Sequence, residues 1–234
     1  MQAPEMWTRV ATTAAHEGEA VSGELVATLN ALRDLIQTES ITRKAPGEPD
    51  YVLASGRHSR YYCDLKKVTL SPEGSWLVGE LLFQLYDGAT EAVGGLQLGA
   101  TFMATAVALV SAQHGRPIYG FTIRDTQKQH GTRENKAESY HPDGALLCSG
   151  RRVVIVDDVV TEGGSILKAI NAVRDLECEI VEVVALVDRG EGGTQRLRAM
   201  GLPYISIFEA DPSGSLRISS DLQRRKELPR VVPT

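Results

Sequence analysis

The amino-acid sequence predicts an α/β fold built on a central parallel sheet with helices on both faces. Short, β-branched apolar runs such as residues 153–156 alternate with stretches whose apolar residues follow the helical period, as from Ser165 onward. Strands that alternate with helices are typical of parallel sheets whose crossover helices cover both faces. At 234 residues, with 42% hydrophobic and 24% charged residues, the chain has the size and composition of one globular domain with a sizeable core.

Charge and cysteine content limit the partners and the compartment that we expect. The net charge is −5, and the basic cluster at residues 224–226 is too short to provide a nucleic-acid footprint. Cys63, Cys148 and Cys178 form neither a CxxC pair nor a zinc-ligand pattern, which is typical of a reduced protein. Residues 1–20 lack the pattern of a signal peptide, and no apolar run reaches transmembrane length. We therefore expect a cytoplasmic chain with no nucleic-acid and no membrane partner.

The N-terminal third predicts a tail, two helices and a small appendage between them. Residues 1–21 are expected to form a mobile tail, and Ser22 is expected to cap the first helix. Two short strands at residues 51–53 and 61–65 predict a hairpin-like appendage. Pro72, with Ser before it and Glu after it, predicts the start of the second helix. The apolar stripes of the two helices consist of Leu25, Leu29, Leu32, Leu35 and Ile36, and of Leu77, Leu81, Leu82 and Leu85.

The remainder of the chain alternates between strands and helices. Strands are predicted at residues 92–95, 118–123, 153–156, 180–187 and 204–208. Helices are predicted at residues 101–114, from Ser165 onward and near 195–200. Ligands of parallel α/β sheets bind outside the carboxyl ends of the strands, so the segments that follow these strands should meet at one site. The last residues, 211–234, predict a surface helix or tail.

The most informative stretch is residues 153–165, VVIVDDVVTEGGS. Its apolar strand leads to two adjacent acids, Asp157 and Asp158, and Gly163 and Gly164 then open an amphipathic helix. The free N–H groups at a helix N-terminus favour an anion such as phosphate. Two acids beside a phosphate are explained if they accept hydrogen bonds from hydroxyls of the same ligand or lie near Mg²⁺. A glycine turn alone is common, but two buried neighbouring acids are costly without a partner, so the stretch predicts a sugar-phosphate site.

Residues 124–144 form a long polar segment with no helical period. A compact domain rarely carries about twenty residues without regular structure unless they form a lid or are disordered. A solvated insertion is the simpler alternative, but the position directly after a predicted strand favours a lid. Arg124, Lys128 and His130 would then bring positive charge to an anionic leaving group while the lid excludes water.

Residues 153–165 resemble the phosphoribosyl-pyrophosphate (PRPP) signature of the type I phosphoribosyltransferases. That signature has four apolar residues, two acids, two apolar residues, Thr, any residue and Gly/Thr-Gly-Ser; Glu162 stands where Thr or Ala is usual. The resemblance implies the type I phosphoribosyltransferase fold, acids that hold the ribose 2′ and 3′ hydroxyls, and a turn that wraps the 5′-phosphate. The residues implied in PRPP binding are Arg124, Asp157, Asp158, Val159, Val160, Thr161, Glu162, Gly163, Gly164 and Ser165.

Four further segments are similar to orotate phosphoribosyltransferases. Residues 51–64 resemble the N-terminal hood of that family, residues 124–132 resemble its catalytic loop, and residues 69–74 and 187–193 also match its pattern. The resemblance implies transfer of the phosphoribosyl group from PRPP to orotate, which gives orotidine 5′-monophosphate and pyrophosphate in pyrimidine biosynthesis. The implied catalytic residues are Lys128, His130, Asp157 and Asp158, and the implied orotate-binding residues are Tyr62, Cys63, Thr161 and Arg189.

The same resemblance implies a domain organisation, a cofactor and an assembly. Residues 22–210 would form a single phosphoribosyltransferase domain, with the hood at about 22–70 and a flexible catalytic loop at 124–144. Residues 211–234 would be a C-terminal extension. Mg²⁺ would be held mainly through the substrate near the two acids, with no other protein ligand assigned. A homodimer is expected, because in the family the loop reaches into the active site of the neighbouring subunit.

A few positions depart from the family pattern. Ala54 stands where many members have Lys, Asp125 where a Lys usually follows the Arg, and Thr101 and Phe102 where Asp-Pro is usual. Two alternatives therefore stay open: a phosphoribosyltransferase for another base, and a catalytically weak protein that senses PRPP. Retention of the loop cations and of Arg189 argues against the sensor, which needs neither a catalytic lid nor an orotate clamp.

Overall fold

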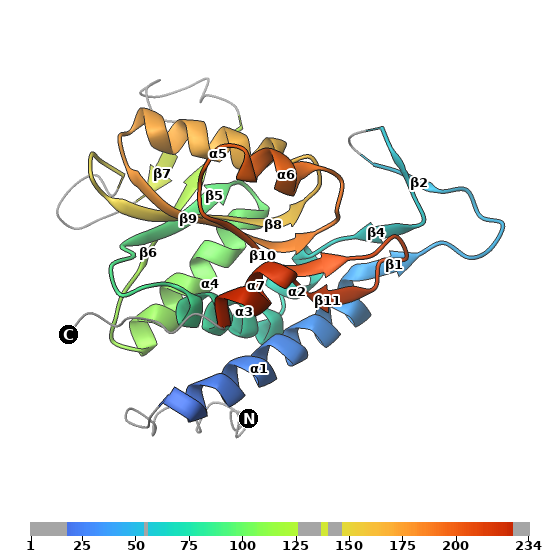
Figure 1. Cartoon of the computed structure of the whole chain (residues 1–234), viewed down its shortest axis with the longest axis horizontal. Helices are drawn as coiled ribbons and strands as arrows, with labels where there is room; N and C mark the ends of the chain where they lie inside the picture. Colours follow the sequence, from blue (N-terminus) through green and yellow to red (C-terminus); the bar gives the residue numbers. More distant parts are fainter. Residues whose placement is uncertain (1–17, 54–55, 126–136, 140–146, 227–234) are drawn as a thin grey trace.

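The computed structural model describes residues 18–53, 56–125, 137–139 and 147–226, which form an α/β fold (Figure 1). Within these ranges the central sheet has the strand order β11-β10-β9-β8-β5-β6-β7. The inner strands run parallel, and they are β10 (Tyr204–Ala210), β9 (Glu179–Asp188), β8 (Arg152–Val160), β5 (Ala92–Leu96) and β6 (Tyr119–Ile123). The edge strands, β11 (Leu216–Ile218) and β7 (Ala137–Ser139), pair antiparallel. The predicted α/β class with a mostly parallel sheet is confirmed.

Helices cover both faces of the sheet because alternate strand residues point to opposite sides. Val154 and Val156 of β8 face a core shared with α1 (Gly18–Leu35), α3 (Pro72–Leu85) and α4 (Gly99–Gln113). Val153 and Ile155 face the other core, which is closed by α5 (Gly164–Asp175) and α6 (Gly193–Arg198). Figure 1 shows α5 and α6 on one side of the sheet and α1, α3 and α4 on the other.

The first helix begins earlier than predicted. It starts at Gly18 rather than at Ser22, so Ser22 lies inside α1 and does not cap it. Nothing in the preceding Gly-Glu-Ala-Val stops a helix, and packing of the apolar stripe decides the extent of the element rather than the cap residue. Leu29 and Leu32 of the predicted stripe are fully buried. A π-helical turn, η3 (Ile36–Ser40), follows directly.

The start of α3 agrees with the prediction. The Ser71 hydroxyl accepts a hydrogen bond from the Gly74 N–H at 3.0 Å, and Pro72 occupies the first turn. Leu81, Leu82 and Leu85 of its predicted stripe are buried. The single turn α2 (Lys66–Thr69) before it was not predicted, because four residues are too few to show a helical period.

The hood contains two small antiparallel pairs instead of the single predicted hairpin. β2 (Tyr51–Val52) pairs with β3 (His58–Ser59), and β4 (Tyr61–Cys63) pairs with β1 (Ile41–Arg43). The two strands predicted around the turn therefore do not pair with each other. Strands of two or three residues carry too little alternation to be found from sequence, so β1 and β3 were missed.

The base of the hood rests on the turn between β10 and β11. Arg43 donates hydrogen bonds to the carbonyls of Ser213 (2.9 Å) and Gly214 (3.0 Å), and Gln37 donates to Gly214 at 3.0 Å. Gly214 also packs against the Tyr61 ring, where a Cβ would lie within 2.7 Å of the ring carbon. Segments about 170 positions apart thus meet beneath the hood.

The C-terminal segment is more structured than the predicted surface helix or tail. β11 adds an antiparallel strand to the sheet, and α7 (Ser220–Lys226) follows it. Leu222 is buried, and the Arg225 guanidinium donates to both Glu182 carboxylate oxygens (2.6 and 2.7 Å) and to the Leu85 carbonyl (2.8 Å). These contacts fasten α7 to β9 and to the end of α3.

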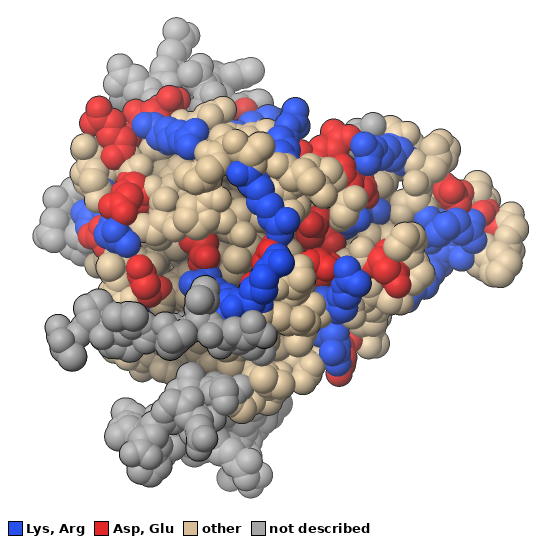
Figure 2. All heavy atoms as spheres, viewed as in Figure 1, with Lys and Arg blue, Asp and Glu red and all other residues tan. Residues whose placement is uncertain are grey.

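The long polar segment contains a strand that the sequence did not predict. Ala137–Ser139 form β7 on the edge of β6, a position set by backbone pairing rather than by side-chain alternation. On the face shown in Figure 2, Lys and Arg are interspersed with Asp and Glu. In the part of the chain that the structure describes, no helix is long and apolar enough to cross a membrane.

Candidate active site

Three strand ends and the loops that follow them meet at one edge of the sheet. Gly99, at the start of α4 after β5, lies against the carboxylate of Asp158, so any side chain at residue 99 would collide with it. Gly193, after β9, donates its N–H to the Thr161 carbonyl at 2.9 Å, and a Cβ there would lie 2.6 Å from the same oxygen. The segments that follow β5, β8 and β9 therefore lie together, as predicted for the carboxyl ends of parallel strands.

The two acids of the motif are desolvated. The sequence predicted that the strand ends before these acids. In the structure β8 continues past them, paired in register with β9. Asp157 is 7% exposed, and burial together with the neighbouring Asp158 charge raises the pKa of Asp157 well above its usual value. Burial also raises the pKa of Asp158, against the opposing effects of the Val159 N–H (2.8 Å) and the Lys66 ammonium. Two such carboxylates are suited to accept hydrogen bonds from ligand hydroxyls or to face a cation.

The turn after β8 has backbone geometry that suits an anion. Gly163 has a φ of 79°, a left-handed conformation that glycine adopts without strain, and α5 begins at Gly164. The N–H groups of the first helical turn have no acceptor within the helix. Ile166 and Ile170 are buried and hold this end of α5 against the sheet. The turn therefore offers fixed donors beside the two acids.

Glu162, the unusual acid of this loop, faces the hood. Its carboxylate lies 3.5 Å from the Arg57 guanidinium, with about half of each side chain exposed. Arg196 donates to the Glu162 carbonyl at 3.4 Å, and Arg57 donates to the Glu191 carbonyl at 3.4 Å. Two arginines thus flank the loop and offset the negative charge of Glu162.

Arg189 is held by three partners beneath the hood. Its Nε lies 2.9 Å from Glu191 Oε1, and its Nη2 donates to the Ser59 hydroxyl at 3.0 Å. The guanidinium also stacks on the Tyr61 ring, with 4.4 Å between Cζ and the ring centroid. The Arg189 side chain is only 5% exposed. A desolvated guanidinium in a fixed orientation is suited to bind a carboxylate.

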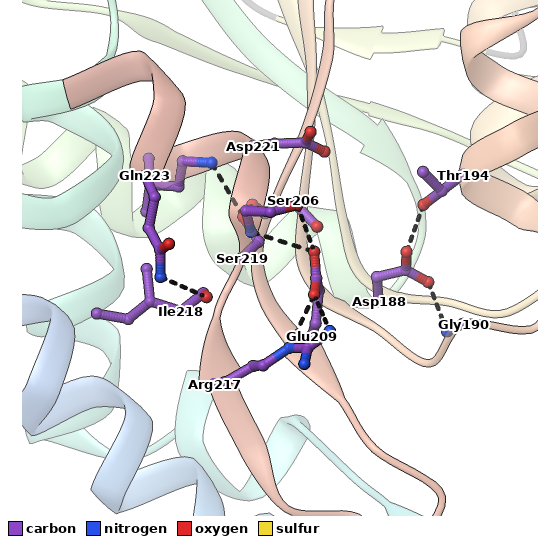
Figure 3. A network of polar contacts seen from close by, with 12 residues as sticks. Asp188, Gly190, Thr194, Ser206, Glu209, Arg217, Ile218, Ser219, Asp221 and Gln223 are labelled. Atoms are coloured by element: carbon purple, nitrogen blue, oxygen red, sulfur yellow. Dashed lines mark hydrogen bonds and ion pairs between the residues drawn. The ribbon is translucent and has the colours of Figure 1, made fainter. Parts of the chain in front are cut away.

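Asp188 fixes the loop that carries Arg189 (Figure 3). One Asp188 carboxylate oxygen accepts the Gly190 N–H at 2.8 Å, and the other accepts the hydroxyl of Thr194 in the first turn of α6. The Thr194 oxygen is also 3.1 Å from the hydroxyl of Tyr204. Asp188 is buried at the end of β9. The loop is therefore tied to rigid elements at both of its ends.

The two predicted base-site residues of β4 lie on opposite faces of the strand, as successive strand residues do. Cys63 shares a face with Tyr61, and burial raises the pKa of its thiol to about 12 despite the nearby Arg189 charge. The thiol is therefore neutral at ordinary pH. Tyr62 is 45% exposed and its ring packs against another hood tyrosine. The structure places Cys63 beside Arg189 and Tyr62 on the other side of the strand, and both roles stay predictions.

The predicted catalytic loop is described only at its first residues. Arg124 directly follows β6, and the carboxylate of Asp125 lies 2.5 Å from Lys168 Nζ on α5. The unusual acid at position 125 thus has a cationic partner. Lys128 and His130 lie outside the described residues.

The other departures from the family pattern are only partly visible. Thr101 lies in the first turn of α4, and its hydroxyl is 2.7 Å from that of Thr122 on β6. Phe102 is half-buried beside it. Ala54 lies outside the described residues. The Thr101–Thr122 contact joins α4 to β6 near the strand ends.

Sequence reasoning missed several residues that the fold brings to the site. Ser59 and Tyr61 lie within the hood segment and Glu191 within the stretch after β9, but nothing in the sequence shows that they surround Arg189. Gly99 follows the apolar end of β5, a weak signal by itself. Nothing in the sequence relates Lys66 to Asp158, but in the structure burial raises the pKa of the Asp158 carboxyl and the Lys66 ammonium acts to lower it.

Protein donors for a metal are few at this site. Among the described residues, no group of three or more His, Cys, Asp or Glu side chains could hold a metal ion. Asp157 and Asp158 fit Mg²⁺ in their donor chemistry, because hard cations prefer carboxylate oxygens and a nearby cation favours the ionised form of buried acids. Most coordination positions of such an ion would be left to substrate oxygens and water.

Comparison with known proteins identifies the family. A family model described as "Phosphoribosyl transferase domain" matches residues 82–198. The chain is 43% identical over 173 residues to the orotate phosphoribosyltransferase of Bradyrhizobium diazoefficiens, which covers 74% of this chain and 91% of the relative. The chain belongs to the orotate phosphoribosyltransferase family. The orotate phosphoribosyltransferase of Aquifex aeolicus is 40% identical over 179 residues, covering 76% of this chain and 93% of that one.

Solved structures agree with this assignment. The Mycobacterium tuberculosis orotate phosphoribosyltransferase in complex with Fe(III) dicitrate has a TM-score of 0.63 and 35% identity, covering 80% of this chain and 99% of its own. The same protein in complex with PRPP has a TM-score of 0.60 and 34% identity, covering 78% and 96%. The predictions of an orotate phosphoribosyltransferase, of its fold and of a pentosyltransferase within the glycosyltransferases are confirmed.

Proposed function

We propose that PRPP binds at the carboxyl end of β8, with Asp157 and Asp158 accepting hydrogen bonds from the ribose hydroxyls. The observation that carries this proposal is the buried carboxylate pair directly beside the glycine turn that opens α5. Backbone N–H groups of residues 161–165 take the 5′-phosphate. The ribose hydroxyls add donors to the two desolvated carboxylates, which in the protein alone accept the backbone N–H groups of Asp158 (3.2 Å) and Val159 (2.8 Å). One sugar phosphate thus satisfies both halves of the motif.

Orotate binds between the hood and the ribose in this proposal. Arg189 is fixed at Nε by Glu191 and at Nη2 by Ser59, and we assign its remaining guanidinium N–H groups to the orotate carboxylate. Thr161 lies beside the loop of Arg189 and contributes a polar contact, and Cys63 presents a neutral thiol. Tyr62 contributes from the hood. The Mycobacterium tuberculosis orotate phosphoribosyltransferase has been solved in complex with PRPP, which supports PRPP as a ligand of this chain.

The transfer step breaks the bond between the anomeric carbon and pyrophosphate and forms the bond to an orotate nitrogen. Negative charge grows on the departing pyrophosphate, and we assign Arg124, Lys128 and His130 to offset it. Asp157 and Asp158 would lie beside Mg²⁺ brought in by PRPP, and the ion would supply further positive charge to the diphosphate. The catalytic loop excludes water, which would otherwise attack the electron-poor sugar carbon.

A homodimer completes the site, with the catalytic loop of one subunit reaching the active site of the other. The exposed side of α4 supports this proposal: Leu98 and Leu109, 59% and 60% exposed, lie on one helical face with the half-buried Phe102 between them. Exposed apolar surface of this kind marks contact with a partner, here a second copy of the chain. We also assign the enzyme to the cytoplasm, in keeping with its three free thiols.

The test is a turnover assay on the purified chain with Mg²⁺, PRPP and orotate. Turnover is measured as the loss of orotate absorbance and as the release of pyrophosphate. Conversion that requires all three components supports the proposal. Parallel reactions replace orotate with other bases, and calorimetry measures PRPP binding in the absence of a base. Turnover only with another base selects the alternative phosphoribosyltransferase. Binding of PRPP without any turnover would sink the enzyme and select the sensor.

A further inference from the structure

Two cysteines that take no part in the transfer reaction meet at the opposite end of β8. The Cys178 thiol donates a hydrogen bond to the Cys148 carbonyl, with 3.2 Å between sulfur and oxygen. The two residues lie 30 positions apart in the sequence, so the fold alone brings them together. Both are free thiols. β8 runs from this corner to the substrate site, and at about 3.3 Å per residue the corner lies on the order of 15 Å from Asp157.

Backbone hydrogen bonds hold the two cysteine segments side by side. The Arg151 N–H donates to the Cys148 carbonyl at 3.1 Å, which closes a turn just before β8. The Gly150 N–H donates to the Glu177 carbonyl at 3.0 Å, and the Glu179 N–H donates to the Arg151 carbonyl at 2.9 Å. These bonds bracket Cys178 on both sides. The backbone segments that carry the two thiols therefore stay side by side as long as β8 and β9 are paired.

The three thiols of the chain differ in their access to an oxidant. Cys148 is exposed, whereas Cys178 is 8% exposed and burial raises the pKa of its thiol. Cys63 lies at the substrate site, where burial raises the pKa of its thiol to about 12. Because the thiolate is the form that reacts, an oxidant in solution reaches Cys148 first and Cys63 last. Cys178 is then the nearest sulfur to the oxidised Cys148.

We propose that Cys148 and Cys178 form a reversible intramolecular disulfide when the enzyme meets a peroxide. The Cys148 thiolate attacks one peroxide oxygen, the O–O bond breaks, and Cys148 becomes a sulfenic acid. The Cys178 sulfur then attacks the Cys148 sulfur, the S–O bond breaks, and the Cys178 proton leaves with the hydroxide as water. In sum, two thiols and one hydrogen peroxide give one disulfide and two waters. A thiol reductant reverses the bond.

The disulfide has a defined mechanical effect. It closes the loop of residues 148–178, which contains β8, the PRPP motif and α5. Cross-linking the open base of this unit restricts the unfolded chain and so stabilises the folded one. Because the bond forms at the end of β8 away from the acids, the oxidised enzyme keeps its turnover while its resistance to heat rises.

The test is peroxide treatment of the full-length protein, followed by alkylation, digestion and mass spectrometry with and without reduction. We expect a Cys148–Cys178 peptide pair, 2 Da lighter than the sum of its two reduced peptides, that disappears on reduction, while Cys63 is recovered as a free thiol. The oxidised protein should unfold several degrees higher than the reduced protein. Over-oxidation of Cys148 with Cys178 still reduced overturns the proposal, as does preferential oxidation of Cys63.

Two variants separate the roles of the paired cysteines. In Cys178→Ser the reaction should stop at the Cys148 sulfenic acid, which dimedone traps, and peroxide should not raise the unfolding temperature. In Cys148→Ser the Cys178 thiol should remain reduced under the same treatment. A cross-linked product of Cys63 with either partner, or a disulfide between two chains through Cys148, contradicts the intramolecular pairing.

Discussion

The two acids of β8 weaken the ligand-free fold, and this effect belongs to the scale of single residues. Asp157 is buried beside another carboxylate, and burial raises its pKa well above the ordinary 3.8. The folded chain therefore holds the Asp157 proton more tightly than the unfolded chain does. It follows that the free energy of unfolding falls as pH rises above about 4, because ionised Asp157 is less favourable in the fold than in water.

Asp157→Asn should stabilise the ligand-free protein while removing turnover. The amide keeps the shape of the carboxylate without its charge, so we expect the free energy of unfolding at pH 7 to rise by roughly 1–3 kcal/mol. Urea unfolding across pH 4–8 measures the change, and the gain over wild type should shrink toward acid pH. An unchanged or lower stability at pH 7 would show that the Asp158 backbone N–H, 3.2 Å from the Asp157 carboxylate, already offsets its buried charge.

The ion pair between Arg57 of the hood and Glu162 of the turn after β8 can be tested by exchanging the two charges. Arg57→Glu alone places two acids together and should raise the KM for PRPP and orotate about two- to five-fold, since exposed pairs contribute below about 1 kcal/mol. The double variant Arg57→Glu with Glu162→Arg should recover part of the loss. The control exchanges Arg217 and Glu209, an ion pair 2.8 Å apart whose side chains are 78% and 21% exposed, and this exchange should leave KM unchanged. No recovery in the double variant would show that the pair does not position the hood.

At the scale of elements, the connection from β5 to α4 positions Asp158. Gly99→Ala places a methyl group where the Asp158 carboxylate lies, so it should displace that side chain and raise the Kd for PRPP at least ten-fold. Isothermal calorimetry measures the affinity. Gly88→Ala is the control, because a Cβ at residue 88 meets nothing within 4 Å. Equal affinities in the two variants would contradict the tight packing of Gly99 on Asp158.

The helix α7 depends on Arg225 for its attachment. Arg225→Ala leaves the mostly buried Glu182 carboxylate without its bidentate partner and removes the bond to the Leu85 carbonyl. We expect the free energy of unfolding to fall by about 1–3 kcal/mol. This loss is smaller than for a fully buried ion pair, because solvent screens the 30% exposed Arg225 side chain. Arg224→Ala, whose side chain is 68% exposed, should change it by less than about 0.5 kcal/mol. Urea unfolding measures both variants. Equal decreases in the free energy of unfolding for Arg225→Ala and Arg224→Ala would show that Arg225 does not attach α7.

The sequence predicted the long elements and missed the short ones. β8 and β9, nine and ten residues long, are rich in Val and Ile, and α3 carries a cap, a proline and a leucine stripe, so local chemistry determines these elements. β7 and β3 have three and two residues and exist only because a neighbouring strand offers free backbone groups. At the site, the PRPP motif was visible because it is contiguous. The cradle of Arg189 was not, because its members come from the hood and from the loop after β9.

At the scale of the whole molecule, the exposed apolar face of α4 is the proposed contact between two subunits. Leu109→Glu should shift the protein toward the monomer, because it places a charge within the proposed subunit contact. Light scattering after gel filtration measures the mass, and turnover should fall at low protein concentration if the loop acts across the contact. Val26→Glu, on exposed α1, is the control and should leave the mass unchanged. A dimer that survives Leu109→Glu would place the interface on another face.

The hood also joins two distant segments of the chain. Arg43 and Gln37 donate to the carbonyls of Ser213 and Gly214, across as many as 177 positions. The family model matches residues 82–198, so the support of the hood lies outside the segment that this model matches.

This arrangement also orders events during synthesis. The ribosome makes Arg43 of the hood 171 positions before Gly214 of the turn that supports it. Contacts of such high sequence separation close late, because the long intervening loop must first be ordered. The segment with the PRPP motif is thus made before the turn that supports the hood. Under the proposed function, the orotate side of the site is completed only after residues 213 and 214 have been made.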